Sequence, residues 1–274
     1  MAVYRITFSK MHGAGNDFIV IDNRKRLFDP GLFTQKIPGL CDRKFGIGAD
    51  GVLLLQDDDV TAYHMIYKNA DGSDAGMCGN GARCLALFAC KLGFNTRHTF
   101  RVGKDVYHAI VDENTVTIQF PVETRVRLLN ESSYGDLYQI HTGTEHIVLK
   151  SNSELLDRDS DLIHLGSELR HSSLFSPTGT NVNFMSIKPG NRIRLRTYER
   201  GVENLTLACG TGAIASAIAA HSLNPEKPEQ EQYTAECDGG HLNISFFYNQ
   251  KSGNYSKLTL KGPAEFVFEG RIDI

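Results

Sequence analysis

Two short segments of this chain repeat one pattern, a cysteine followed by Gly-x-Gly-Ala, and each opens a run that is poor in charge. The first reads CGNGA at residues 78–82 and the second reads CGTGA at residues 209–213. The residues that follow, ARCLALFACKL and AIASAIAAHSL, are apolar on nearly every side of a helix. A helix of this kind must be surrounded by protein. The repeat therefore predicts two similar halves, each with one buried central helix that begins beside a cysteine.

Most of the remaining chain alternates between apolar and polar residues, as short strands do. Since few other helices are expected, these strands must cover the two apolar helices. We therefore expect an α+β fold of two pseudo-symmetric halves, each a curled, mainly antiparallel sheet around a buried central helix, with a crossover near residues 121–123. Further helices are expected from about residue 30 to 41 and from 161 to 171. The expected strands are Tyr4–Met11, Phe18–Asp22, Gly51–Gln56, Ala62–Lys68, Thr115–Phe120, Asp136–His141, His146–Lys150, Arg192–Tyr198, Leu242–Tyr248 and Lys257–Leu260.

Composition excludes several classes of function. With 274 residues the chain is long enough for one large domain or two ordinary ones. Its formal net charge of −3 argues against binding to nucleic acid or to an anionic membrane surface. The sequence has neither a signal-peptide pattern at its start nor an apolar run of the ~20 residues that span a bilayer, so we expect a cytoplasmic protein. Six cysteines without a Cys-x-x-Cys pair argue against a disulfide framework and against structural zinc, and we expect no metal.

The repeated motif suits acid–base chemistry at carbon. The N-terminus of a helix offers unpaired N–H groups and a partial positive charge, which favour a thiolate or a bound carboxylate. Glycine lets the backbone approach a ligand closely. If Cys78 and Cys209 faced opposite sides of one carbon, they would form the acid–base pair that inverts it. By contrast, Cys84 and Cys90 lie inside the first apolar run and are expected to pack in the core.

A dinucleotide site is the alternative interpretation of the second motif, because residues 210–215 fit Gly-x-Gly-x-x-Ala. That site needs a following strand that ends in an acidic residue about 20 positions later. Here the chain runs instead into Asn-Pro-Glu-Lys-Pro at residues 224–228. We therefore expect no nucleotide and no other cofactor.

Seven motifs in order, MHGAGNDF, GIGADG, NADGS, MCGNGARC, TNVNFM, ERGVE and ACGTGA, resemble the diaminopimelate epimerase family over nearly the whole chain. The resemblance implies an isomerase, independent of pyridoxal phosphate, that interconverts LL- and meso-diaminopimelate in the pathway to lysine and peptidoglycan. It also implies that the C-terminal strand returns to the first half. The expected domains are therefore residues 1–121 with 264–274, carrying Cys78, and residues 122–263, carrying Cys209.

The resemblance also assigns roles to residues. Cys78 and Cys209 would be the catalytic thiols. The backbone N–H groups of Gly79, Asn80, Gly210 and Thr211 would hold the reacting carboxylate. His146 and Glu199 would lie beside the reacting amino group, while Asn16, Asn69, Asn181 and Arg200 would recognise the far end of the substrate.

One stretch departs from the family pattern, while the small residue Gly51 is a familiar variant within it. Where the family usually has Asn or Ser followed by Pro before the histidine, this chain has Thr144 and Glu145. Glutamine is common in the family where this chain has Gly51. The departure at Thr144 and Glu145 leaves open a racemase or epimerase of the same fold that acts on another amino acid. A redox-responsive dithiol or ligand-binding protein is the second alternative.

The expected partner is a small amino-acid substrate, with no nucleic acid and no membrane. The sequence does not fix the oligomeric state, and it leaves a homodimer open.

Overall fold

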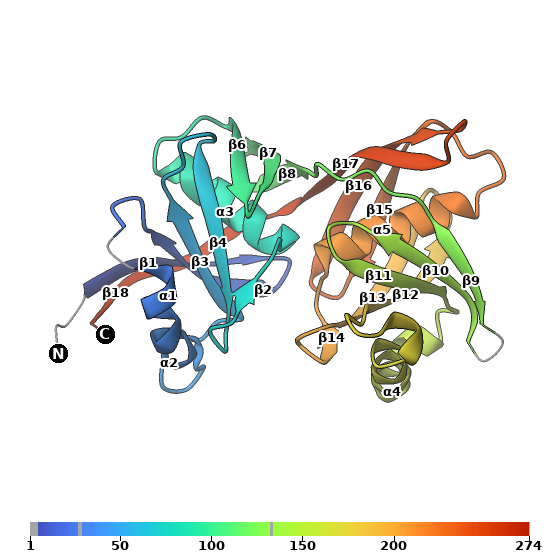
Figure 1. Cartoon of the computed structure of the whole chain (residues 1–274), viewed down its shortest axis with the longest axis horizontal. Coiled ribbons are helices and arrows are strands. Elements are labelled where there is room, and N and C mark those ends of the chain that lie inside the picture. Colours follow the sequence, from blue (N-terminus) through green and yellow to red (C-terminus); the bar gives the residue numbers. More distant parts are fainter. Residues whose placement is uncertain (1–4, 27–28, 132–133, 274) are drawn as a thin grey trace. The chain divides into compact units, whose positions relative to one another are not determined.

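The fold is known from a computed structural model that describes residues 5–26, 29–131 and 134–273 (Figure 1). Contacts between residues divide the chain into two compact units. The first unit comprises Met1–Phe120 and Gly262–Ile274, and the second comprises Pro121–Lys261. The domain ranges expected from the sequence, 1–121 with 264–274 and 122–263, stay a prediction.

In the first unit, strands surround the long helix α3 (Gly79–Lys91) (Figure 1). Neighbouring strands in the sheet follow the order β18-β1-β2-β3-β4-β6-β7-β8. All pairs are antiparallel except β2 with β3 and β4 with β6, and the short β5 (Asp74–Ala75) pairs with β4. The strand bounds are β1 Arg5–Gly13, β2 Asn16–Asp22, β3 Gly51–Gln56, β4 Tyr63–Asn69, β6 Arg97–Val102, β7 Asp105–Asp112, β8 Thr115–Gln119 and β18 Glu265–Asp273.

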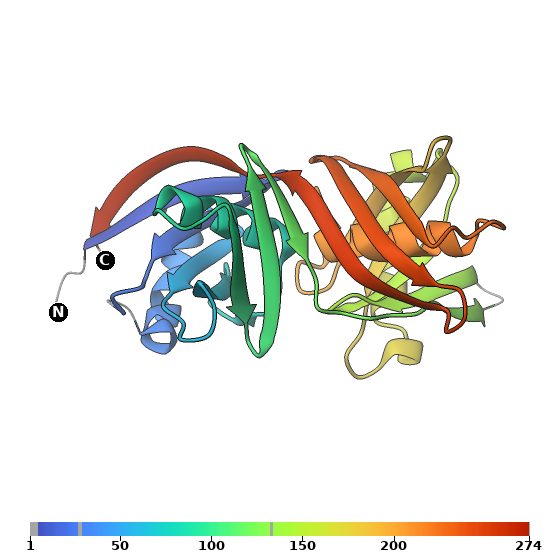
Figure 2. The same cartoon turned by 90° about the horizontal axis from the view of Figure 1, so that it is seen from above.

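The second unit repeats this arrangement around helix α5 (Gly210–Ser222) (Figure 2). Its strand order is β9-β10-β11-β12-β13-β15-β16-β17, and β11 with β12 and β13 with β15 are the parallel pairs. The short β14 (Asn204–Thr206) pairs with β13, as β5 does with β4. The strand bounds are β9 Arg127–Glu131, β10 Gly135–His141, β11 Glu145–Lys150, β12 Asn181–Lys188, β13 Arg192–Glu199, β15 Gln230–Cys237, β16 Gly240–Asn249 and β17 Asn254–Pro263. The expected pseudo-symmetric α+β fold is confirmed.

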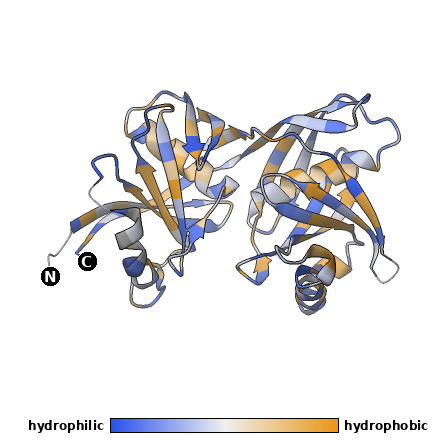
Figure 3. Cartoon of the chain, in the orientation of Figure 1, coloured by the Kyte–Doolittle hydropathy of each residue, from blue (hydrophilic) through white to orange (hydrophobic). Residues whose placement is uncertain are grey.

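The two central helices are buried along most of their length. All residues from Gly79 to Ala89 in α3 and from Gly210 to His221 in α5 are buried. Figure 3 shows α5 largely in the hydrophobic colours, while the strands around it alternate. Burial of apolar surface on every side of these helices is the main stabilising contribution that their sequences provide.

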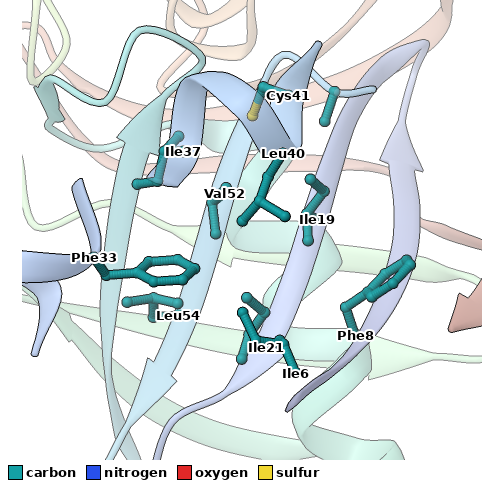
Figure 4. Close-up of a cluster of buried hydrophobic side chains, with 11 residues drawn as sticks. Ile6, Phe8, Ile19, Ile21, Phe33, Ile37, Leu40, Cys41, Val52 and Leu54 are labelled. Atoms are coloured by element: carbon teal, nitrogen blue, oxygen red, sulfur yellow. The ribbon is translucent and has the colours of Figure 1, made fainter. Parts of the chain in front are cut away.

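The other face of each sheet carries a second core. In the first unit, Phe33, Ile37 and Leu40 pack on apolar side chains of β1, β2 and β3, such as Ile19 and Leu54 (Figure 4). In the second unit, α4 (Asp159–Arg170) contacts β12, β13 and β14. Each half is therefore layered, with a short helical segment outside the sheet and the long helix within its curve.

The helix expected over residues 30–41 is present only as three short pieces. These are α1 (Pro30–Phe33), a 3-10 turn (Thr34–Lys36) and α2 (Ile37–Cys41). Pro38 has no N–H to donate to the carbonyl of Thr34, so a continuous α-helix cannot pass through this point.

Within the part of the chain that the structure describes, no helix combines the length and the apolar character that a membrane crossing requires.

Candidate functional site

Cys78 and Cys209 occupy equivalent positions, each as the residue that caps the N-terminus of a central helix. The backbone angles of Cys78 are φ −116° and ψ 116°, and those of Cys209 are φ −112° and ψ 112°. In this extended conformation, the cap residue places its side chain beside the first unpaired N–H groups of the helix. The repeated sequence motif thus produces the same local geometry in both units.

The second glycine of each motif lets the helix begin close against its neighbours. A Cβ added at Gly81 would lie 3.1 Å from the side chain of Leu53 on β3. A Cβ added at Gly212 would collide with Oδ1 of Asn183 on β12 and would lie 3.3 Å from Sγ of Cys209. A larger residue would therefore press on the side chain of Leu53 in the first unit and on those of Asn183 and Cys209 in the second.

In the first unit, the thiol of Cys78 lies among amide groups. Its Sγ is 3.6 Å from Oδ1 of Asn16 and accepts a hydrogen bond from the backbone N–H of Gly81 at 3.5 Å. The side-chain Nδ2 of Asn80 donates to the same Asn16 oxygen at 3.3 Å. Three residues that the sequence singled out are therefore in direct contact.

Asn69 lies at the end of β4 and donates from Nδ2 to the hydroxyl of Ser73 at 3.0 Å. It pairs across the sheet with Gly51, which in turn pairs with Phe18 on β2. These registers bring Asn69 to the same end of the sheet as Asn16, the first residue of β2.

In the second unit, Sγ of Cys209 lies 3.6 Å from the hydroxyl of Thr211. That hydroxyl is 3.0 Å from Nε2 of His146, and Thr144 lies 2.9 Å from the same nitrogen. The other ring nitrogen, Nδ1, accepts from the amide of Asn183 at 3.1 Å. Because Nδ1 is the acceptor, Nε2 carries the proton and donates it toward the two threonine hydroxyls.

His146 is fully buried, and this burial lowers its pKa to about 3, with a further contribution from the positive charge of Arg200. The imidazole is therefore neutral at ordinary pH. It donates a hydrogen bond to the hydroxyl of Thr211, which in turn lies 3.6 Å from Sγ of Cys209. The role of His146 beside the reacting amino group, which the resemblance implied, stays a prediction.

The remaining predicted residues of this unit gather where β11, β12 and β13 meet. Asn181 pairs with His146 across the parallel strands. Its Nδ2 donates to the carbonyl of Glu145 at 3.0 Å, and its Oδ1 accepts from the backbone N–H of Arg200 at 2.9 Å. Glu199 accepts from Thr206 at 3.0 Å. Asn181 therefore fixes the turn that presents Glu199 and Arg200.

Sequence reasoning missed several residues that hold these groups. Asn183 has two further bonds, to the carbonyl of Ile147 at 2.8 Å and from the hydroxyl of Thr197 at 3.0 Å. The segment TNVNFM contains Asn183, but only the tertiary structure shows that this second asparagine orients His146. Asp50 and Arg83, which contact Asn16 and Asn80, were missed in the same way.

Cys84 and Cys41 lie in the cores. Burial raises the pKa of Cys84 to about 12 and that of Cys41 to about 11. Both therefore stay protonated and unreactive at ordinary pH. The expected core position is confirmed for Cys84 but is wrong for Cys90, which lies near the end of α3 and is only partly buried. Among the described residues, no group of three or more His, Cys, Asp or Glu side chains is arranged to hold a metal ion.

Comparison with known proteins connects this geometry to a family. The family model described as diaminopimelate epimerase matches residues 8–123 and 138–267. The chain is 41% identical over 265 residues to the diaminopimelate epimerase of Flavobacterium psychrophilum, covering 96% of this chain and 98% of that protein. It is 37% identical over 290 residues to the diaminopimelate epimerase of Methanocella arvoryzae, covering 98% of each.

Solved structures with the same fold are more distant in sequence. A phenazine biosynthesis protein of the PhzF family from Bacillus anthracis matches with a TM-score of 0.76 and 12% identity, covering 99% of this chain and all of that chain. A hydroxyproline epimerase from Agrobacterium vitis matches with a TM-score of 0.72 and 13% identity, covering 100% of this chain and 92% of that one. These likenesses concern the fold alone.

Proposed function

Since the chain belongs to the diaminopimelate epimerase family, we propose that it is an isomerase of lysine biosynthesis that interconverts LL- and meso-diaminopimelate with Cys78 and Cys209 as its two bases. The family match and the relatives above 35% identity support the reaction. The equivalent capping positions of the two cysteines support the assignment of the thiols.

The proposed reaction exchanges one proton for another. One sulfur, as thiolate, takes the hydrogen from the α-carbon and becomes a thiol. The electron pair left on carbon then takes a proton from the other thiol on the opposite face, and that sulfur becomes the thiolate. The total charge of the pair is unchanged, so the reverse reaction uses the same two groups with their roles exchanged.

The transition state places negative charge on the substrate carboxylate. The N-termini of α3 and α5 offer the backbone N–H groups of Gly79, Asn80, Gly210 and Thr211, which suit this charge. Such fixed donors need no reorganisation during the reaction.

The remaining substrate contacts are also proposals. Glu199 and His146 would serve the reacting amino group, with His146 acting through the threonine hydroxyls that it contacts. Asn16, Asn69, Asn181 and Arg200 would recognise the distal amino and carboxyl groups. The cytoplasmic location, the homodimer and the lack of a cofactor stay predictions.

Label transfer tests the mechanism directly. The protein is incubated with LL-diaminopimelate in D₂O under reducing conditions, and deuterium at the α-carbon is followed by mass spectrometry. C78A and C209A are each expected to lose epimerisation by at least about a thousandfold, because no other group delivers or removes the proton. C237A is the matched control and keeps wild-type turnover. Full activity in C209A would rule out the two-thiol scheme.

A panel of substrates decides between this proposal and a related epimerase. Thr144 and Glu145 differ from the family pattern, yet the Thr144 hydroxyl bonds His146 and the Glu145 carboxylate bonds His141 at 2.9 Å. Both departing side chains thus have partners within the second unit. Diaminopimelate is expected to exchange its α-hydrogen faster than any amino acid without a distal zwitterion. Thiols that oxidise and reduce without turnover of any substrate would favour the redox-responsive alternative.

A further inference from the structure

We propose that Asp50 is a positioning residue for the Cys78 thiol and acts through Asn16. This inference rests on the proposed function of Cys78. Asp50 stands at one end of a chain of hydrogen bonds that runs from the guanidinium of Arg83 through the amides of Asn80 and Asn16 to the Asp50 carboxylate. All of these residues belong to the first unit.

The cationic end of this chain fixes Asn80. Arg83 is fully buried in α3, and its Nη2 donates to Oδ1 of Asn80 at 2.7 Å. The same guanidinium also donates from Nη1 to the carbonyl of Gly79 at 3.3 Å and from Nε to the carbonyl of Pro263 at 3.1 Å. A guanidinium only donates hydrogen bonds, so the oxygen of the Asn80 amide must face it. The Nδ2 of Asn80 is thereby turned toward Asn16.

The anionic end, Asp50, orients the Asn16 amide so that its oxygen faces the NH₂ group of Asn80. Nδ2 of Asn16 donates to Oδ2 of Asp50 at 2.7 Å. A carboxylate only accepts hydrogen bonds, so the nitrogen of the Asn16 amide must face it. The oxygen of that amide then faces Asn80 at 3.3 Å and Sγ of Cys78 at 3.6 Å. The two charged ends therefore specify one orientation for both amides.

The orientation of the Asn16 amide determines whether its oxygen or its NH₂ group faces Sγ of Cys78. An amide oxygen accepts the S–H proton of Cys78, and a hydrogen bond to the neutral form disfavours ionisation. If the Asn16 amide turned over, its NH₂ would face the sulfur and would stabilise the thiolate instead. By orienting Asn16, Asp50 therefore keeps Cys78 protonated and orients its S–H group. The proton stays available for delivery to carbon.

Asp50 is itself anchored. Its Oδ1 accepts from Arg43 at 2.8 Å, and its Oδ2 accepts from the backbone N–H of Asp17 at 3.2 Å as well as from Asn16. The substitution D50N replaces one acceptor with a donor. The remaining oxygen of the introduced amide could accept from Arg43 or from the backbone N–H of Asp17, and the hydrogen bond from the charged guanidinium is the stronger and shorter of the two. The introduced amide nitrogen therefore faces Asn16 and favours the turned-over orientation.

Alkylation of Cys78 measures this orientation without any turnover. The full chain is treated with iodoacetamide at one pH, and the modification rate of Cys78 is obtained from peptide mass spectrometry, relative to Cys90 in the same molecule. D50N is expected to raise this ratio about three- to tenfold, because the thiolate is the reactive form. D42N changes a carboxylate that caps only the nearby loop at Lys44 and Phe45, and it is expected to leave the ratio unchanged.

A double-substitution cycle tests whether Asp50 acts through Asn16. In an N16A background, D50N is expected to have no further effect on the ratio, and D50E is expected to keep it within about twofold of wild type. The proposal also predicts that D50N lowers kcat more than it changes KM. If D50N fails to fold, as judged by thermal unfolding, D50S removes the same acceptor and is assessed by the same ratio.

Two results would overturn the proposal. One is a folded D50N protein whose Cys78 is alkylated at the wild-type rate, and the other is an equally large effect of D50N with and without Asn16. Neither result requires substrate, so failure of this inference is distinguishable from failure of the proposed reaction, which the deuterium experiment decides on its own.

Discussion

At the scale of single residues, the burial of His146 has a consequence for pH. Burial lowers its pKa to about 3, whereas an exposed histidine titrates near about 6.5. The unfolded chain therefore binds a proton that the folded protein rejects. By linkage, the stability contributed by the neutral imidazole is complete above about pH 6.5 and is lost progressively as the pH falls from there toward 3.

We expect H146Q to reduce this pH dependence. Between pH 7 and pH 5, the wild type should lose about 2 kcal/mol more of its free energy of unfolding than H146Q does. Urea unfolding at the two pH values measures the difference, whatever the cost of the substitution at pH 7. H164Q, at an exposed position of α4, controls for the loss of an imidazole. Equal pH slopes in H146Q and the wild type would show that the buried ring is not neutral.

The neighbours of Gly51 explain why this chain has a glycine at that position. A Cβ at this position would lie 2.5 Å from the carbonyl oxygen of Lys68 and 2.6 Å from the ring of Tyr67. We expect G51A to lower the free energy of unfolding by about 1–3 kcal/mol, because a backbone atom of β4 would have to move. G39A is the matched control, since a Cβ there meets nothing within 4 Å. Chemical denaturation of the two variants checks this, and equal stabilities would contradict it.

The residues of the site differ in how far the sequence could predict them. The sequence predicted Cys78, Cys209 and the glycines that follow them, because the repeated Cys-Gly-x-Gly-Ala motif indicates a repeated backbone geometry. Asp50 and Arg83 could not be interpreted in the same way. Asp50 lies 34 residues along the chain from Asn16, the amide that it orients. Arg83 lies three residues from Asn80, but an amide's orientation depends on which charged group faces it, and the sequence does not show that.

At the scale of elements, the pattern of apolar and polar residues predicted many of the strands and both central helices. It missed β7 (Asp105–Asp112), although burial alternates along that strand. It also missed β12 (Asn181–Lys188), whose first six residues are all buried and show no alternation. Strand β15 (Gln230–Cys237) escaped because its sequence QEQYTAEC is mostly polar. The helix expected over residues 30–41 begins and ends where the sequence predicted, but its middle, Thr34–Lys36, is a 3-10 turn that the sequence did not predict. Pro38, which has no N–H for the carbonyl of Thr34, interrupts the α-helical hydrogen bonds. The burial of a strand within the sheet and local interruptions of helical hydrogen bonds therefore limit what the pattern of apolar and polar residues can predict.

At the scale of the whole molecule, both units have the same strand order, with parallel pairs and the central helix at corresponding places. In the second unit the outer strand, β9, directly precedes its neighbour β10 along the chain. In the first unit the corresponding strand is β18, from the other end of the chain, which pairs with β1. Completion of the first sheet therefore depends on the last residues.

Removal of residues 264–274 is expected to destabilise the first unit selectively. Without β18, strand β1 loses a paired neighbour, and Phe8 loses its edge-to-face contact with Phe268 at 5.9 Å between ring centroids. Hydrogen exchange followed by mass spectrometry should show lost protection in β1 and β2, while β10 to β13 keep theirs.

A synthetic peptide of residues 264–274 is expected to restore protection to β1 and β2. The same peptide carrying G270V is the control, because a Cβ at Gly270 would lie 2.7 Å from the ring of Phe8 and should prevent docking. Uniform loss of protection over both units would contradict the prediction, since it would mean that the last strand stabilises the whole chain as a single cooperative body. Selective loss would instead show that β1, which contacts α3, depends on its pairing with β18.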